Sequence, residues 1–167
     1  MFATNQLVVY PAQGVGIIER IDRKEVVGQA CDFYIVRIRS NNITLMVPVA
    51  NAGNVGLRTL ISQDVAQTIL HALHGELEEN VYTGQNWNRR FREYSERLKS
   101  TDLAIVAQVL RELLLIGKSK ELSFGERRLL EQAMSLVTEE LGEVLEISPE
   151  ELRVNLLAHY TVLTAEQ

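Results

Sequence analysis

The sequence has little cysteine, little proline and no long apolar run, and these absences narrow the classes of protein it can belong to. Cys31 is the only cysteine among 167 residues, so the chain cannot form an internal disulfide and fits a reducing, cytoplasmic location. The longest uncharged stretch, residues 40–57, contains four asparagines and Pro48, which excludes a membrane span. The first residues show no basic segment followed by an apolar run, so we expect no signal peptide.

Charge is distributed unevenly along the chain. The net charge is −5, whereas a protein that binds DNA without a partner is usually basic, so strong autonomous DNA binding is not expected. Residues 85–130 nevertheless hold ten basic and six acidic side chains, a net +4, and residues 131–167 hold one basic and eight acidic, a net −7. This distribution predicts one basic surface on an otherwise acidic protein.

The first 60 residues have the pattern of short strands. Apolar and β-branched residues alternate or cluster in four segments, at 7–10, 17–18, 33–39 and 43–47. Gly14 and Gly16 indicate a turn or bulge before the second segment, and Asn41-Asn42 indicates a turn before the fourth. Four or five strands in roughly 55 residues predict a small curled antiparallel sheet or barrel.

From residue 62 onward the apolar period changes to that of helices. We predict helices over 62–74, 86–99 and 102–117, and two more that begin after Ser123 and Ser148. Ser123 and Glu126 have the spacing of a capping box, and Pro149 occupies a first helical position. Strands followed by helices predict an α+β protein, with domain 1–60 as the sheet and domain 61–167 as a bundle of about five helices.

The sequence shows no catalytic constellation. His71 and His74 are three residues apart on one helix with Glu78 nearby, a spacing that two metal ligands can have. A polar helix face explains them better, because the sequence places no third strong ligand beside them. We therefore expect no metal, no cofactor, no small-molecule substrate and no enzymatic activity, with a metal hydrolase as the weakest alternative. We interpret one acidic cluster as a solvated helix face: Glu139, Glu140, Glu143 and Glu146.

Trp87 is the only tryptophan, and it opens a helix rich in basic residues, namely Arg89, Arg90, Arg92, Arg97 and Lys99. An aromatic side chain among arginines can stack on bases or wedge into a base step while the cations neutralise phosphates. The same tryptophan also begins an apolar stripe that continues at Phe91, Tyr94 and Leu98. Spacing alone therefore favours a core role for Trp87, although a tryptophan at a helix start can pack its body and expose one edge.

Five short segments stand out by their composition and by their order within residues 5–145. They are Val8-Val9-Tyr10-Pro11 with Gly14 and Gly16; Phe33-Tyr34-Ile35-Val36; Met46-Val47-Pro48 with Asn51-Ala52 and Val55-Gly56-Leu57-Arg58; Asn86-Trp87-Asn88-Arg89-Arg90; and Leu122-Ser123-Phe124-Gly125-Glu126-Arg127-Arg128. With these segments in this order and spacing, the chain resembles the CarD/CdnL family of bacterial transcription regulators.

The resemblance implies a division of labour between the two domains. In that family a Tudor-like N-terminal domain binds the β subunit of RNA polymerase, and the helical domain contacts the upstream edge of the transcription bubble. By position, the polymerase-binding residues are Lys24, Val36, Met46 and Pro48, although some relatives have arginine in place of Met46. By position too, Trp87 is the minor-groove wedge, and the further DNA-contacting residues are Asn86, Arg89, Arg90, Arg127 and Arg128.

The expected contact with promoter DNA is weak and independent of base sequence. Unstacking a base step costs about a few kcal/mol and aromatic stacking returns about 1–3 kcal/mol per base, so the two terms roughly cancel on free duplex. When the protein is held on RNA polymerase, and through it on the nucleoid, the effective concentration of Trp87 at the promoter rises. Its contact then favours the open complex. The alternative is a protein–protein adapter on RNA polymerase without direct DNA contact, in which Trp87 is buried.

Overall fold

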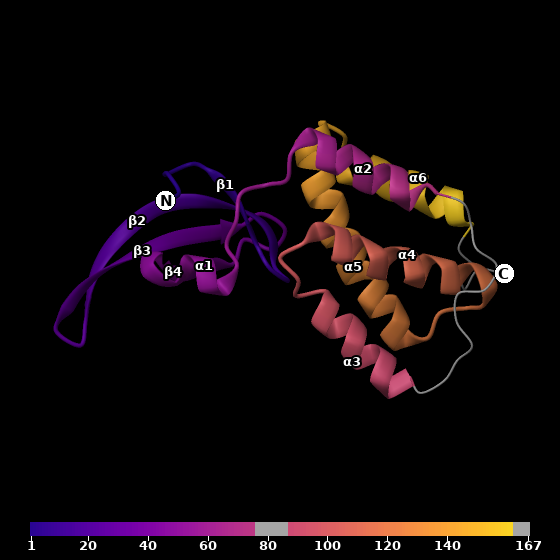
Figure 1. Cartoon of the computed structure of the whole chain (residues 1–167), viewed down its shortest axis with the longest axis horizontal. Helices are drawn as coiled ribbons and strands as arrows, with labels where there is room; N and C mark the ends of the chain where they lie inside the picture. The colour runs from indigo at the N-terminus through magenta and orange to yellow at the C-terminus, as the bar shows by residue number, and fades with distance from the viewer. Residues whose placement is uncertain (76–86, 162–167) are drawn as a thin grey trace. The chain divides into compact units, whose positions relative to one another are not determined.

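The structure is a computed structural model that describes residues 1–75 and 87–161, apart from the side chain of Trp87. The chain divides into two units, Met1–Leu60 and Ile61–Gln167, and each is described by itself (Figure 1). We call them the β unit and the helical unit. Predicted residues 76–86, including Glu78 and Asn86, lie outside the described part of the chain.

The β unit, all of which the structure describes, is a four-stranded antiparallel sheet in the order β1-β2-β3-β4. Its strands are β1 (Leu7–Tyr10), β2 (Gly14–Val26), β3 (Gln29–Ile38) and β4 (Thr44–Pro48). Figure 1 shows β2 and β3 running out together as a long curved hairpin. A curled antiparallel sheet followed by helices confirms the predicted α+β class.

The hairpin of β2 and β3 is longer than the sequence pattern predicted. β2 has 13 residues, whereas alternation indicated only a short strand around Ile17 and Ile18. The register shifts by a bulge between Ile18 and Arg20, and beyond Asp22 most residues of β2 are exposed. Because the outer part of this hairpin has no buried face, its residues do not alternate between apolar and polar, and the pattern is lost.

The core of the β unit lies on one face of the sheet. Val8, Ile18, Tyr34 and Val47 are nearly or fully buried there. A Cβ atom added at Gly16 would lie 2.9 Å from Cγ1 of Val36, so any larger residue would displace a core side chain. The core is closed by a 3₁₀ turn, Val49–Asn51, and a short helix, α1 (Ala52–Val55). The sequence pattern did not predict these two elements.

The helical unit contains five helices within its described residues, in agreement with the predicted number. They are α2 (Gln63–Leu73), α3 (Trp87–Arg97), α4 (Leu103–Ser119), α5 (Phe124–Leu145) and α6 (Pro149–Tyr160). The hydroxyl groups of Ser62, Ser123 and Ser148 accept hydrogen bonds at the starts of α2, α5 and α6, as predicted. Serine caps are therefore reliable markers of helix starts in this chain.

Two predictions for this unit were wrong in detail. The third helix was expected to end at Gly117, but α4 continues to Ser119 and buries Gly117. Glu140 was interpreted as part of a solvated acidic face, yet it is only 1% exposed and one of its carboxylate oxygens accepts a hydrogen bond from the Ile61 N–H at 2.9 Å. The segment before α2 is thus fixed to α5 by a buried carboxylate.

The core of the helical unit is dominated by leucine. Leu110, Leu113 and Leu114 of α4 pack with Leu141 of α5, and α6 adds Leu156. In Figure 1, α2 and α6 run beside one another, and the hydroxyl group of Tyr160 donates a hydrogen bond to the Leu73 carbonyl oxygen. Within the described residues, none of the helices is long and apolar enough to span a membrane.

Candidate nucleic-acid and polymerase interfaces

Three of the four predicted polymerase-binding residues lie on one face of the sheet. Side chains of directly paired residues point to the same face, and faces alternate along a strand. Met46 pairs with Ile35, Pro48 pairs with Phe33, and Lys24 pairs with Cys31, so all three predicted residues lie on the face opposite the core. We call this face the outer face of the sheet.

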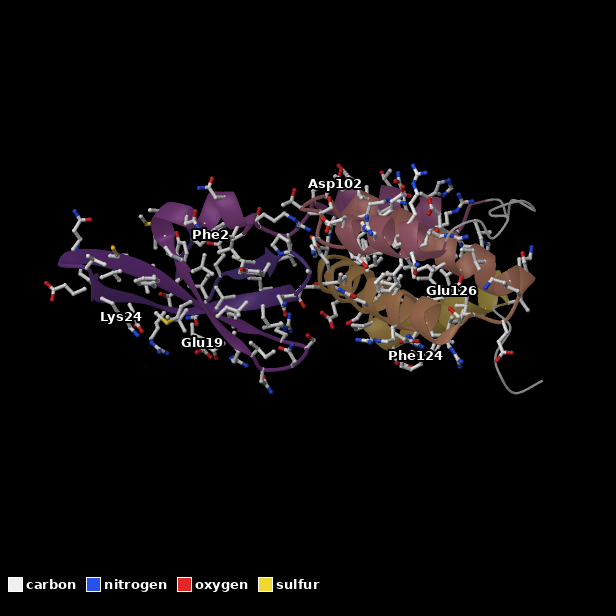
Figure 2. All side chains as sticks on the ribbon, turned by 90° about the horizontal axis from the view of Figure 1, so that it is seen from below. Phe2, Glu19, Lys24, Asp102, Phe124 and Glu126 are labelled. Carbon is white, nitrogen blue, oxygen red and sulfur yellow. The ribbon has the colours of Figure 1, made fainter. Side chains whose placement is uncertain are left out.

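The outer face combines a cation with exposed apolar surface. The Lys24 ammonium group lies 4.0 Å from the sulfur of Met46, and Met46 is 47% exposed. Figure 2 shows Lys24 on the long hairpin. The carboxylate of Glu19 accepts a hydrogen bond from the Arg37 guanidinium at 2.6 Å, so some charges beside this surface are already paired.

Val36 does not belong to this surface. It pairs with Ile18 and Leu45 and is fully buried in the core of the β unit. A side chain with no accessible area cannot contact a partner directly, so its position near the predicted contact residues reflects packing. The sequence could not separate Val36 from Ile35, because β3 buries both faces at this point.

The strand that carries Met46 and Pro48 is an edge strand. In the described chain β4 pairs with β3 alone. The other edge strand, β1, is bridged at Val9 by Arg58, with hydrogen bonds of 2.8 and 3.1 Å between their backbones. An open edge offers main-chain donors and acceptors to an incoming strand, and β4 is therefore the better site for such pairing.

Along the apolar stripe of α3, the side chains become more exposed toward the helix start. Leu98, just past the helix end, is 1% exposed, Tyr94 is 4% exposed and Phe91 is 41% exposed. These residues follow the stripe that begins at Trp87, whose side chain lies outside the described residues. The stripe is therefore a core contact at Leu98 and Tyr94 and is partly exposed at Phe91, one turn into the helix, whereas the neighbouring Arg90 is buried.

Three of the four arginines of α3 are buried or form ion pairs with other residues of the helical unit. The Arg89 guanidinium lies 3.4 Å from the Glu93 carboxylate, and Arg97 donates to Glu112 at 3.2 Å. Arg90, predicted to lie against the DNA backbone, is only 7% exposed. The prediction for Arg90 does not fit this position, because its side chain is buried against the bundle.

Tyr94 shows how closely these groups pack. Burial, with Glu112 as the next cause, raises the pKa of the Tyr94 hydroxyl, and the positive charges of Arg90 and Arg97 oppose the rise. The Tyr94 phenol therefore stays neutral over the physiological range. This part of α3 is a packed polar network, and its charges contribute less to the surface than their number suggests.

The start of α5 is held by a closed set of hydrogen bonds. The Glu126 carboxylate accepts from the Ser123 N–H at 2.9 Å and from the Lys120 ammonium at 2.7 Å, while the Glu126 N–H donates to the Ser123 hydroxyl at 3.2 Å. Burial would raise the pKa of Glu126, but the hydrogen bonds from Lys120 and Ser123 together hold it below its ordinary value. The capping box predicted from the sequence is thus confirmed.

This rigid start displays two arginines, both predicted to contact DNA. Arg127 and Arg128 are exposed, and the Arg128 guanidinium lies 6.0 Å from the centre of the Phe124 ring. Phe124 is itself 73% exposed and lies at the rim of the helical unit in Figure 2. Cations and an aromatic face therefore meet at the surface here.

An open groove of about 700 Å³ separates α3 from the start of α5. Its lining includes Phe91 and Phe124 as aromatic residues, Arg127 and Arg128 as cations, and Glu131 as an anion. The sequence pattern did not predict this groove. Phe124 gave a usable signal, because it follows the capping serine directly and lies off the apolar stripe that α5 buries, so an exposed position was the natural expectation.

Two of the three histidines, His74 and His159, make structural contacts in the helical unit. His71 is exposed, whereas Nδ1 of His74 lies 3.1 Å from the Leu70 carbonyl oxygen and its ring packs edge-on against His159 at 5.1 Å. Nε2 of His159 lies 3.3 Å from the carbonyl oxygen of Gly75. Across residues 1–75 and 87–161 no three potential ligands come together to hold a metal ion.

The two units match two known domain families. The CarD-like/TRCF RID domain matches residues 2–61, and the CarD C-terminal domain matches residues 68–157. The chain therefore belongs to the CarD-like family of transcription factors, a generally non-enzymatic family, and its role is in transcription regulation.

The chain is also similar to individual proteins. One is YdeB of Bacillus subtilis (strain 168), which is named as a transcription factor. It is 27% identical to this chain over 154 residues, which cover 92% of this chain and 98% of YdeB. The solved structure of CdnLNt from Myxococcus xanthus is 45% identical over 37% of this chain and 87% of its own, with a TM-score of 0.32.

Proposed function

We propose that this protein binds the β subunit of RNA polymerase through its β unit and stabilises open promoter complexes through the first turn of α3. The β unit is the domain that anchors, and the helical unit is the domain that contacts DNA. In this proposal the protein acts in the cytoplasm, on the nucleoid, and its contact with promoter DNA is weak and independent of sequence.

The outer face of the sheet supports the proposed anchor. Met46 gives an exposed apolar contact, Lys24 a cation beside it, and Pro48 ends the open edge strand. Pairing of β4 with a strand of the polymerase would provide backbone hydrogen bonds, and these side chains would select the partner. Replacing Met46 with Glu places a charge in this contact, and we expect at least a tenfold loss of affinity for the isolated β subunit.

The observation that carries the DNA-contacting role is the loss of burial along α3. Tyr94 is packed in the core, and Phe91, one turn earlier, already exposes 41% of its surface. Trp87 is one further turn toward the helix start on the same stripe. The proposal extends this loss of burial to Trp87, whose ring would then be available to a separated base step.

Tethering decides whether such a contact is useful. On free duplex the unstacking cost of about a few kcal/mol offsets the stacking gain of about 1–3 kcal/mol per base. On a promoter that the polymerase has already opened, the bases at the bubble edge are already unpaired, so most of the unstacking cost does not arise again. A contact made only in the open complex shifts the equilibrium toward it, about tenfold for each 1.4 kcal/mol.

The test is the lifetime of open complexes after challenge with heparin. We expect Trp87→Ala to shorten the lifetime by about fivefold to tenfold while binding to the β subunit and the far-ultraviolet circular dichroism spectrum stay unchanged. Trp87→Phe should retain part of the effect. An unchanged lifetime, or global unfolding, would overturn the proposed role of Trp87.

A second candidate is an adapter on RNA polymerase without DNA contact. The burial of Arg90 and the ion pairs of Arg89 and Arg97 favour it, because they reduce the positive charge that α3 presents. In that case the unaltered protein would not crosslink to promoter DNA, and Trp87→Ala would not change this result.

A further inference from the structure

The groove between α3 and α5 has an unusual combination of surfaces. Phe91 lines it from α3, and Phe124 lines it from the first turn of α5 with most of its surface exposed. Burying Phe124 and Phe91 is favoured by the hydrophobic effect, so two exposed phenylalanines on one groove suggest that a ligand covers them. The groove volume of about 700 Å³ lies in the range of ligand pockets, about 300–1,000 Å³.

The charges around the groove favour an anionic ligand. Glu131 is held by Arg153 of α6 through two hydrogen bonds of 2.7 Å each, so its charge is compensated. Glu126 is 3% exposed and paired with Lys120. Arg127 is exposed and makes no ion pair with another residue in the described part of the chain, and Arg128 contacts only the Phe124 ring there. The groove therefore presents an excess of positive charge.

We propose that this groove binds a separated DNA strand, with an unpaired base against the rings of Phe124 and Phe91 and the flanking phosphates at Arg127 and Arg128. This inference rests on the proposed function and extends it, because the groove forms a second contact distinct from Trp87. The strand is recognised by chemistry common to all sequences, an aromatic face and a phosphate.

A separated strand fits this surface better than duplex DNA or a peptide. Bases inside a duplex are already stacked on their neighbours, so exposed phenylalanine faces gain little from them, whereas an unpaired base offers a free π face. An apolar peptide segment would cover the phenylalanines but leave the two arginines unpaired. Arginines beside aromatic faces are typical of single-strand binding sites, where they add phosphate and cation–π contacts.

The probe is a fork junction, a short duplex with one single-stranded extension, compared with a blunt duplex of the same length. Binding of the full chain is measured by fluorescence anisotropy at low salt, where the attraction is least screened. We expect Phe124→Ala to weaken fork binding about fivefold or more and to leave blunt-duplex binding unchanged. Phe124→Trp, with a larger stacking surface, should strengthen fork binding.

The arginines have a separate signature. Arg127→Gln and Arg128→Gln should weaken fork binding and each reduce its salt dependence by about one unit of slope. Matched controls are Val154→Ala, an exposed apolar residue on α6, and Lys118→Gln, an exposed cation near the end of α4. Neither lines the groove, and both should bind the fork as the unaltered protein does.

Three outcomes overturn the inference. Unchanged fork binding by Phe124→Ala, or an equal loss on fork and blunt duplex, removes the unpaired base from the groove. If Phe124→Ala loses binding to the polymerase while its binding to both DNA probes is unchanged, the groove binds a protein and not a DNA strand. In each case the lifetime of open complexes formed with Trp87→Ala separately decides the proposed function, since Trp87 is not needed for the groove test.

Discussion

The arginines of α3 and those at the start of α5 look equivalent in the sequence, but the structure uses them differently. On α3, Arg90 is buried and Arg97 is paired with Glu112. At the start of α5, Arg127 and Arg128 are exposed beside a groove with two aromatic residues. Counting basic residues therefore overstates the positive surface of α3, because two of its four arginines are buried or paired with Glu112.

The cause is the position of each helix in the bundle. α3 packs at its C-terminal end through Tyr94 and Leu98, and Arg90, one turn before Tyr94 on the same side, is drawn into the interior. α5 begins with a capping box that turns Glu126 inward, and the next two residues point away from the core. Local helix geometry, rather than composition, decides which cations reach the solvent.

The largest expected effect that distinguishes the two sets concerns stability. Arg90→Ala should lower the free energy of unfolding by about 2–3 kcal/mol, because it removes a long buried side chain and leaves a void. Arg127→Ala should change it by less than about 0.5 kcal/mol, as for most surface substitutions. Urea unfolding measures both, and a similar cost for the two variants would contradict the contrast.

A smaller effect concerns the cap that displays Arg127 and Arg128. Glu126→Ala should lower the free energy of unfolding by about 1–2 kcal/mol, since it leaves the Ser123 N–H and the Lys120 ammonium without their acceptor. Glu126→Gln should cost less, because an amide oxygen can still accept from Ser123. Equal losses for the two variants would show that charge matters more than the cap.

The same residue predicts a pH dependence. Because the folded pKa of Glu126 is below its ordinary value, its ionised form stabilises the fold above the unfolded pKa of about 4.3. That contribution is lost as the pH falls through the folded pKa. The difference in stability between the unaltered protein and Glu126→Gln should be full at pH 7 and should shrink below about pH 4, which urea unfolding at several pH values can follow.

The smallest expected effect concerns Arg89. An exposed ion pair four residues apart on a helix contributes about 0.3–0.5 kcal/mol, so Glu93→Gln should hardly alter stability. The substitution removes one negative charge beside Arg89 and should strengthen binding to a fork junction by about twofold. Unchanged or weaker binding, measured by anisotropy against unaltered protein, would show that Arg89 does not face the DNA.

Much of the fold could be predicted because local signals and packing agree. Serine caps located the starts of α2, α5 and α6, and the apolar residues at helical spacing on α5, such as Leu130, Val137 and Leu141, are buried. The signals failed where tertiary packing decides the outcome. Glycine at position 117 indicated a helix end, but α4 continues because its glycine is buried in the core, and α1 depends on the sheet it covers.

The candidate sites were predictable as regions but less so as residues. The resemblance assigned Lys24, Met46 and Pro48 to one partner, and the sheet register places them on one face, while their binding to the polymerase stays a prediction. The sequence did not show that Val36 and Arg90 are buried. Val36 lies in a strand that is buried on both faces, and Arg90 lies beside an apolar stripe, and neither pattern marks the residue as buried. The groove itself depends on two helices that are distant in the sequence, and only the structure brings them together.

The last helix has a consequence for synthesis. Leu152, Leu156 and Tyr160 of α6 fill the centre of the helical unit, so a nascent chain that lacks them exposes the leucines of α4 and α5. The sheet of the β unit uses only residues before 61 and can form while the rest is still being translated. The β unit can thus fold first, and the described helices complete their packing after residue 160 has left the ribosome.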